Sequence, residues 1–247
     1  MDRNRLLHEM GLGPVWKLRR AKAVVEEPAA EKKPAALAAP VDAVAAPGLH
    51  SARSNPDLAT LDWEALAATV AACRQCRLCE ARKQAVLGVG DRHADWLFVG
   101  EGPGAEEDER GEPFVGQAGK LLDNMLAAIG LRRGEDVYIA NAVKCRPPQN
   151  RTPEAEEIAA CRPYLERQIA LLQPKLIVAL GRPAAQSLLQ TEVKIASARG
   201  QLHDCHGIPL IVTYHPAYLL RTLLDKAKAW EDLCFMRKTM KTLKGQA

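Results

Sequence analysis

Short apolar runs alternate with longer amphipathic stretches from about residue 57 to the end of the chain. Each apolar run has the length of a buried strand, and the runs cover residues 95–100, 137–141, 176–181 and 209–214. Short apolar strands that alternate with helices form a parallel sheet with helices on both faces. The pattern therefore predicts an α/β domain over residues 57–247.

The stretches between these runs repeat apolar residues at the spacing of a helix. Helices are predicted at residues 61–72, at 118–130 with Gly130 as the stop, from Pro153 with Thr152 as the N-cap, and at about 223–244. In the helix from Pro153 the apolar face includes Cys161, which therefore points inward. In the last helix the predicted apolar face consists of Ala227, Trp230, Leu233, Met236 and Met240.

The first 56 residues lack this alternation. Residues 1–20 mix large apolar side chains with arginines and a lysine, which predicts a short amphipathic and basic segment. Two interpretations stay open for it, a protein partner or packing on its own domain. Residues 21–56 are rich in Ala and Pro and almost free of large apolar side chains, which predicts a flexible linker.

Composition places limits on the class of protein. The chain has 247 residues, 47% of them hydrophobic, and a net charge of only +4, so polyanion binding requires a local patch of charge. Among its apolar runs none reaches the roughly 18–20 residues of a membrane span, and the N-terminus lacks a signal-peptide pattern. Seven cysteines at these spacings fit metal-bound or free thiols in a reducing compartment, so we expect a cytoplasmic protein without a membrane partner.

Four cysteines have the spacing of a metal site. Cys73 and Cys76 are two residues apart in the pattern C-x2-C, and Cys145 and Cys161 form a second pair far along the chain. The two pairs could complete a shell of four thiolates around an iron–sulfur cluster or a structural zinc ion. Cys79 extends the first pair, and spacing alone does not exclude it as a ligand.

Polar chemistry gathers where the predicted strands end, and open parallel sheets bind ligands at that edge. Asn141 could read the imide edge of a pyrimidine, Phe114 could stack on a base, and His215 could donate a hydrogen bond to an oxygen that becomes anionic. Each residue also has an ordinary structural interpretation: a loop amide, a core aromatic and a buried histidine. Basic residues near the same strand ends could contact a phosphate backbone or form a solvated surface: Lys144, Arg146, Arg151, Arg182 and Arg221.

Five blocks of sequence resemble the iron–sulfur uracil-DNA glycosylases, often called family 4. The blocks span residues 73–78, 99–126, 138–161, 176–189 and 214–221. The resemblance covers nearly all of residues 70–222 and implies a three-layer α/β/α sandwich with a four-stranded parallel sheet. It also implies a [4Fe–4S] cluster and a ligand set without Cys79: Cys73, Cys76, Cys145 and Cys161. Structural zinc stays the alternative cofactor, because a shell of four cysteines suits both metals.

The same resemblance implies an enzyme that flips deoxyuridine out of DNA and hydrolyses its N-glycosidic bond. Its uracil pocket would use the Gly102 region, Phe114, Asn141 and His215. Glu107 resembles the residue that crowds the pyrimidine 5-position and disfavours thymine.

The best-known branch of the superfamily has a catalytic aspartate where Gly102 stands here, which leaves Glu101 as the nearest carboxylate for activating water. Three residues could fill the space that the flipped nucleotide leaves: Leu219, Leu220 and Arg221. The alternative function is an iron–sulfur protein that binds damaged DNA without cleaving it. In either case we expect a monomer that works at the nucleoid.

Overall fold

A computed structural model of the chain describes residues 58–245, and the segments predicted at 1–20 and 21–56 lie outside the described residues. Its sheet has the strand order β1-β3-β2-β4-β6-β5. The central strands run parallel to one another, and they are β2 (Trp96–Gly100), β3 (Val137–Asn141), β4 (Leu176–Leu180) and β6 (Ile208–Thr213). These four strands coincide with the four apolar runs of the sequence.

Two antiparallel edge strands extend the parallel sheet. β1 (Val89–Gly90) pairs with β3, and β5 (Leu202–Cys205) pairs with β6. The α/β prediction is confirmed, while the predicted count of four strands becomes six. Neither edge strand has an apolar run, because β1 is only two residues long and β5 carries polar residues and an exposed leucine, Leu202.

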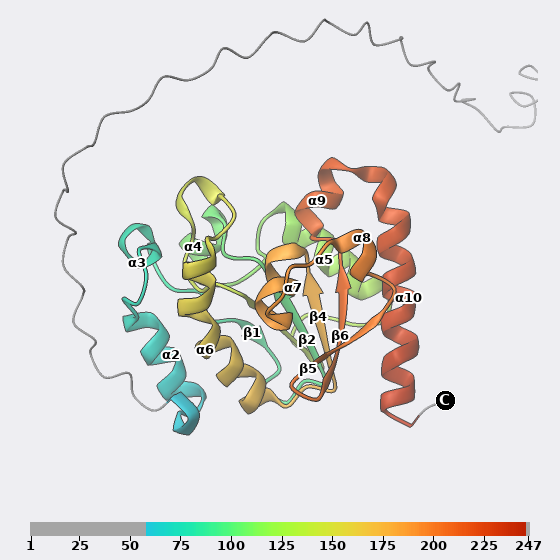
Figure 1. The fold of residues 1–247 in the computed structure, drawn as a ribbon, viewed down its shortest axis with the longest axis horizontal. Helices are drawn as coiled ribbons and strands as arrows, with labels where there is room; N and C mark the ends of the chain where they lie inside the picture. Colours follow the sequence, from blue (N-terminus) through green and yellow to red (C-terminus); the bar gives the residue numbers. More distant parts are fainter. Residues whose placement is uncertain (1–57, 246–247) are drawn as a thin grey trace, which may run out of the picture. The chain divides into compact units, whose positions relative to one another are not determined.

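The sheet lies between two layers of helices (Figure 1). On one face Leu97 and Val99 of β2 belong to an apolar cluster with residues of α6 (Ala155–Leu172) and α7 (Arg182–Leu189). On the other face Trp96 and Phe98 belong to a cluster with residues of α5 (Gln117–Ala128) and α10 (Lys226–Leu243). Successive strand residues thus supply opposite cores, which is the three-layer α/β/α sandwich expected from the resemblance.

A further helix covers the outer side of α6. α2 (Trp63–Ala72) begins after Asp62, whose carboxylate accepts a hydrogen bond from Ala65 N at 2.8 Å. Between α2 and α6 lies a third apolar cluster that includes Cys145 and Cys161, with Cys73 and Cys76 packed against it. The predicted inward position of Cys161 is confirmed, and the cysteines lie in this outer layer.

Two helical details differ from the sequence prediction. α6 begins at Ala155 and is capped from Glu154, whose N–H donates to Glu157 Oε2 at 2.8 Å, so the predicted cap at Thr152 is wrong. The predicted apolar face of α10 is partly wrong, because Ala227 and Trp230 are exposed. The residues of α10 that are buried are Ala229, Asp232, Leu233, Met236 and Met240.

Short elements complete the connections, and several of them stand at the carboxyl edge of the sheet. They are η1 (Leu58–Thr60), α3 (Leu78–Ala81), α4 (Ala105–Arg110), η2 (Pro148–Asn150), α8 (Ile195–Ala198), α9 (Pro216–Arg221) and η3 (Leu223–Asp225). In the described part of the chain, no helix combines the length and apolar character needed to cross a bilayer.

Candidate active site

A cavity of about 800 Å³ opens at the carboxyl ends of the parallel strands. Its lining comes from the loops after β2 and β3 and from the residues that follow β4 and β6. Because all four strands point the same way, residues distant in sequence meet there. The sequence-predicted residues that line it together are Glu101, Gly102, Glu107, Phe114, Asn141 and His215.

Asn141 is the last residue of β3 and is 2% exposed. Its side-chain oxygen Oδ1 is buried and has no hydrogen-bond partner among the described residues. A buried acceptor without a partner costs about 1–3 kcal/mol, so a ligand that supplies an N–H would recover that free energy. The side-chain oxygen of Asn141 can therefore accept a hydrogen bond from a ligand in the cavity.

Phe114 adopts a left-handed backbone conformation, with φ of +56°, and its side chain is buried against the cavity. Arg133 holds this strained turn by donating to the carbonyl oxygens of Pro113 at 2.9 Å and Phe114 at 2.8 Å. A Cβ atom on Gly100 would lie 2.5 Å from both Phe114 Cζ and Asn141 Oδ1. Glycine at position 100 thus leaves the space that the aromatic ring and the amide share.

His215 is the N-cap of α9 and stacks with Phe114, with ring centroids 5.5 Å apart. Its Nδ1 accepts a hydrogen bond from Ala217 N at 3.1 Å, which places the proton of the neutral ring on Nε2. Burial, together with the nearby Arg221, lowers the pKa of His215 to about 4, although Glu107 opposes this shift. At neutral pH the ring is therefore an uncharged donor through Nε2–H.

Two carboxylates that follow β2 have different surroundings, Glu101 in the loop and Glu107 in α4. Glu107 accepts hydrogen bonds from Gly104 N at 3.0 Å, Val115 N at 2.9 Å and Gly116 N at 3.1 Å, and so joins two loops of the cavity wall. Burial raises the pKa of Glu101, while Thr152 and Arg182 lower it. Glu101 is thus a partly desolvated carboxylate at the cavity wall.

Gly102 lies beside Glu101 in the same loop, where a Cβ atom would meet Val143 Cγ2 at 2.7 Å. Only a residue without a side chain fits there unless Val143 moves.

The predicted basic residues divide into three groups. Arg182 and Arg221 are exposed at the cavity, where a phosphate could reach them. Arg151 also lines the cavity, but its guanidinium binds the Glu157 carboxylate through two contacts of 2.8 and 2.7 Å. The third group comprises Lys144 and Arg146.

The prediction that Lys144 contacts DNA is wrong. Its side chain is 1% exposed, and Nζ donates to Asn141 O at 2.8 Å and to Gln168 Oε1 at 2.5 Å. Arg146 is half-buried, and its Nε donates to Asn150 Oδ1 at 2.7 Å.

The set of residues predicted to fill the space of the flipped nucleotide also changes. Leu219 is 1% exposed and packs in the core, so it cannot enter DNA from this position. Leu220 is 42% exposed, and the following η3 adds Leu223 at 63% and Leu224 at 91%. The exposed apolar side chains near the cavity therefore lie at and after position 220, beside the exposed Arg221.

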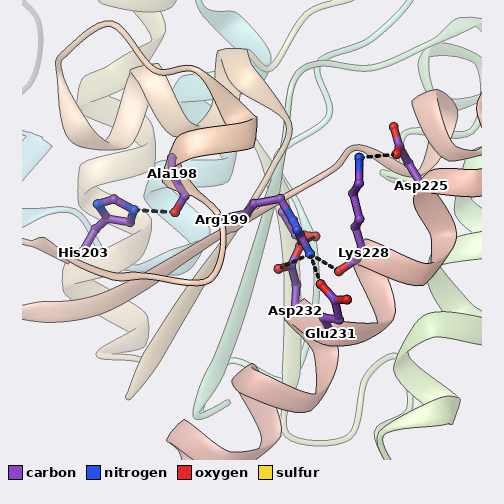
Figure 2. A network of polar contacts seen from close by, with 8 residues as sticks. Ala198, Arg199, His203, Asp225, Lys228, Glu231 and Asp232 are labelled. Carbon is purple, nitrogen blue, oxygen red and sulfur yellow. Dashed lines mark hydrogen bonds and ion pairs between the residues drawn. The ribbon is translucent and has the colours of Figure 1, made fainter.

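The sequence analysis missed an aromatic pair at the cavity. Tyr214 and Tyr218 line it and stack with centroids 5.1 Å apart. The guanidinium of Arg199 lies 5.6 Å from the Tyr214 ring and contacts Asp232, Glu231 and the Lys228 carbonyl (Figure 2). The sequence signal was two tyrosines near His215, four residues apart, but Arg199 follows α8 and reaches them across β5 and β6.

Five cysteines line a second, small cavity at the C-terminal end of α2. Its lining includes the predicted ligands Cys73, Cys76, Cys145 and Cys161, together with Cys79. No group of His, Cys, Asp or Glu side chains within residues 58–245 forms a ready site for a metal ion.

Hydrogen-bond donors approach three of the predicted ligand sulfurs. Arg82 Nη1 donates to Cys145 Sγ at 2.8 Å, Lys144 N to Cys161 Sγ at 3.2 Å and Tyr164 OH to Cys73 Sγ at 3.3 Å. Donors of this kind favour thiolates, which are the form that binds metal. Burial opposes them and raises the pKa of Cys145 to about 11 and that of Cys161 to about 12. The four cysteines and their donors fit a thiolate-bound centre once a metal displaces the thiol protons.

Comparison with known proteins decides the family. Residues 87–234 match the family model described as the Uracil DNA glycosylase superfamily. The chain belongs to this superfamily. It is 43% identical over 181 residues to the type-4 uracil-DNA glycosylase of Pyrobaculum aerophilum, covering 70% of this chain and 92% of that protein.

Two further relatives place the chain within the superfamily. The type-4 uracil-DNA glycosylase of Archaeoglobus fulgidus is 48% identical over 159 residues, which cover 61% of this chain and 79% of that protein. The type-5 uracil-DNA glycosylase of Thermus thermophilus is 34% identical over 191 residues, covering 63% and 87%. The resemblance to the type-4 group that the sequence blocks indicated is confirmed.

Proposed function

We propose that this chain is a DNA repair enzyme that extrudes deoxyuridine from DNA and hydrolyses its N-glycosidic bond, releasing uracil and leaving an abasic site. The observation that carries the proposal is the buried Oδ1 of Asn141 at the cavity, which has no hydrogen-bond partner within residues 58–245. Uracil presents an N–H between two carbonyl groups, so its edge offers the donor that this oxygen lacks. The amide nitrogen of Asn141 would donate to the neighbouring carbonyl of the base.

Phe114 and His215 complete the proposed base pocket. The buried ring of Phe114 offers an aromatic face for the base, and its position is held by Arg133. Nε2–H of His215 would donate to the carbonyl oxygen between the two ring nitrogens of uracil. The base cannot be reached inside a duplex, so the nucleotide must be flipped out at a cost of a few kcal/mol.

The chemical step breaks the bond between C1′ of the sugar and N1 of uracil. The bonding electrons leave with the base, whose negative charge spreads onto the carbonyl oxygen that faces His215. A neutral donor aimed at that oxygen stabilises the developing anion, and removing one such donor typically lowers the rate by about 10²–10³. Water then adds to C1′ and loses a proton, for which Glu101 of the cavity wall is the proposed acceptor.

DNA would approach across the cavity mouth. Arg182 and Arg221 are the exposed cations of that rim and would contact phosphates, with smaller contributions from Arg146 and the paired Arg151. Leu220 and its exposed neighbours would occupy the gap that the flipped nucleotide leaves. We further propose that the chain acts as a monomer at the nucleoid in the cytoplasm, since DNA is its substrate.

The cysteine cavity would hold a [4Fe–4S] cluster through Cys73, Cys76, Cys145 and Cys161. When bound, the cluster would cross-link the segment after α2 to the segment that follows Asn141. The three donors aimed at these sulfurs support the proposal because they suit thiolate ligands. The residues themselves perform the base recognition described above, and the cluster takes no part in the chemical step.

One preparation tests the function and the cofactor together. Protein purified without oxygen is assayed for free uracil from a uracil-containing oligonucleotide, with a thymine-containing oligonucleotide as the comparator. We expect free uracil, no free thymine, and an Asn141→Leu variant that folds but loses at least 10²-fold in rate. Tight binding without free base from folded, metal-loaded protein would favour the non-cleaving alternative. Four iron atoms per chain are expected, whereas one zinc ion would replace the cluster in the proposal.

A further inference from the structure

Lys144 is a fully buried lysine between the cysteine cavity and the base pocket. It follows β3 three residues after Asn141 and immediately precedes Cys145. Its side chain is 1% exposed, and no carboxylate forms an ion pair with it anywhere in residues 58–245. Burying an ammonium group without an anionic partner costs free energy of folding. Other contacts must therefore hold Lys144 in the core.

The contacts of Lys144 point in two directions. Its backbone N–H donates to Cys161 Sγ at 3.2 Å. Its Nζ donates to the backbone carbonyl of Asn141 at 2.8 Å. One residue therefore touches a proposed metal ligand with its backbone and the proposed base-reading residue with its side chain.

The second acceptor of Lys144 Nζ is itself fixed. Gln168 Oε1 lies 2.5 Å from Nζ, and Gln168 Nε2 donates to Leu87 O at 3.0 Å and to Tyr138 OH at 3.3 Å. Gln168 belongs to α6 and is 0% exposed. The ammonium is thereby held at one point of the core, between α6 and the end of β3.

The backbone position of Asn141 matters for the direction of its side chain. Oδ1 has no hydrogen-bond partner among the described residues, so the direction of the amide depends on the position of the chain at the strand end. The next residue, Ala142, still donates to Gly100 O at 2.9 Å, whereas the Asn141 carbonyl receives the Lys144 ammonium. A shift of the backbone at residues 144–145 would move Lys144 Nζ, and the hydrogen bond from Nζ to Asn141 O would then move the amide that is proposed to bind the base.

We propose that Lys144 is a positioning residue that couples the thiolate centre to uracil recognition by fixing Asn141. The coupling rests on the proposed function, because it concerns the affinity of the same pocket for uracil. Coupling of this kind is reciprocal: a centre that strengthens uracil binding is itself stabilised by bound uracil.

The first test compares Lys144→Met with Lys175→Met, which removes a lysine from a half-exposed surface pair with Asp95. The Kd for free uracil is measured on samples with equal iron content and equal folded fraction. We expect Lys144→Met to raise the Kd about tenfold and Lys175→Met to leave it unchanged. An unchanged Kd in iron-loaded Lys144→Met overturns the coupling.

The second test uses reciprocity, which a merely structural lysine would not produce. Iron loss to a chelator is followed with and without saturating uracil. Uracil should slow the loss severalfold in the wild-type protein and much less in Lys144→Met, whereas equal protection in both would overturn the proposal.

Three further outcomes also decide between the proposals. If Lys144→Met does not fold, Gln168→Met keeps the ammonium and removes its second acceptor, and an unchanged uracil Kd in that variant also overturns the coupling. A wild-type protein that neither binds uracil nor releases it removes the proposed function and, with it, the coupling. A wild-type protein that does both, alongside unaffected variants, removes the coupling alone.

Discussion

Replacing Gly100 by alanine places one methyl group where the base pocket has no space for it. The added Cβ would lie 2.5 Å from Phe114 Cζ, 2.6 Å from Phe114 Cε2 and 2.5 Å from Asn141 Oδ1. Real Cβ contacts essentially never fall below 3.0 Å, so the ring and the amide must each move by about 0.5 Å or more. The perturbation thus acts on both proposed base-reading residues at once.

Neither neighbour can move freely. Phe114 is held by its left-handed backbone, by the Arg133 hydrogen bonds and by stacking on His215, and Asn141 ends a central strand. Overpacking of this kind costs about 1–3 kcal/mol in unfolding free energy. A misplacement approaching 1 Å at a reacting centre lowers kcat/KM by up to about 10²-fold, so we expect a loss of roughly 10–100-fold.

The assay measures kcat/KM on a uracil-containing oligonucleotide and the urea midpoint of the same preparation. Gly134→Ala is the matched control, because nothing lies within 4 Å of its added Cβ while its φ of +82° disfavours alanine. The control should lose about 1 kcal/mol of stability and keep its activity per folded molecule. If Gly100→Ala loses stability but keeps kcat/KM within twofold, the proposed roles of Phe114 and Asn141 are refuted.

Two other predictions concern titration and the cavity wall. The low pKa of His215, about 4, predicts a kcat/KM that is flat from pH 8 to about 5 and falls as the pH passes through 4, because protonation puts a hydrogen on Nδ1 opposite Ala217 N–H. In the unfolded chain the histidine has a pKa near 6.5, so the folded protein should lose stability as the pH drops from about 6.5 to 4. A midpoint of the pH–rate profile near 6.5 would show an ordinary pKa in the folded protein, and it would contradict both the rate prediction and the stability prediction. Glu107→Ala leaves the three N–H groups of Gly104, Val115 and Gly116 without their acceptor, so the unfolding free energy should fall by about 2 kcal/mol, whereas Glu107→Gln should lose less. Equal urea midpoints for wild type and Glu107→Ala would contradict that bracing role.

The central strands could be predicted because each is buried on both faces, so the sequence shows continuous apolar runs such as LIVAL at 176–180. The edge strand β5 could not, because its residues LHDC are partly exposed and its pairing depends on β6 across a turn. Trp230 shows the same limit in a helix, since its helical spacing fits the predicted face although its side chain is 48% exposed. Apolar patterns therefore locate buried elements well and exposed ones poorly.

In the candidate site, too, some residues could be predicted from the sequence and others could not. Asn141 and His215 could be predicted because strand ends converge whatever the loops do. Lys144 was misassigned because a basic residue after a strand end reads as solvent-exposed, and its burial depends on Cys161 and Gln168 in another element. The tautomer of His215 depends on a backbone N–H two residues away, which sequence composition does not reveal.

Binding of free uracil compared with N3-methyluracil tests the central interaction most directly. The buried Oδ1 of Asn141 is proposed to accept the N3–H of the base, and a methyl group at N3 removes that donor and fills its space. A site built around a hydrogen bond rejects an analogue that lacks it by factors up to about 10⁴–10⁵. The wild-type protein should bind uracil and show no measurable binding of N3-methyluracil at the same concentrations. Equal dissociation constants for the two bases would contradict base recognition by Asn141.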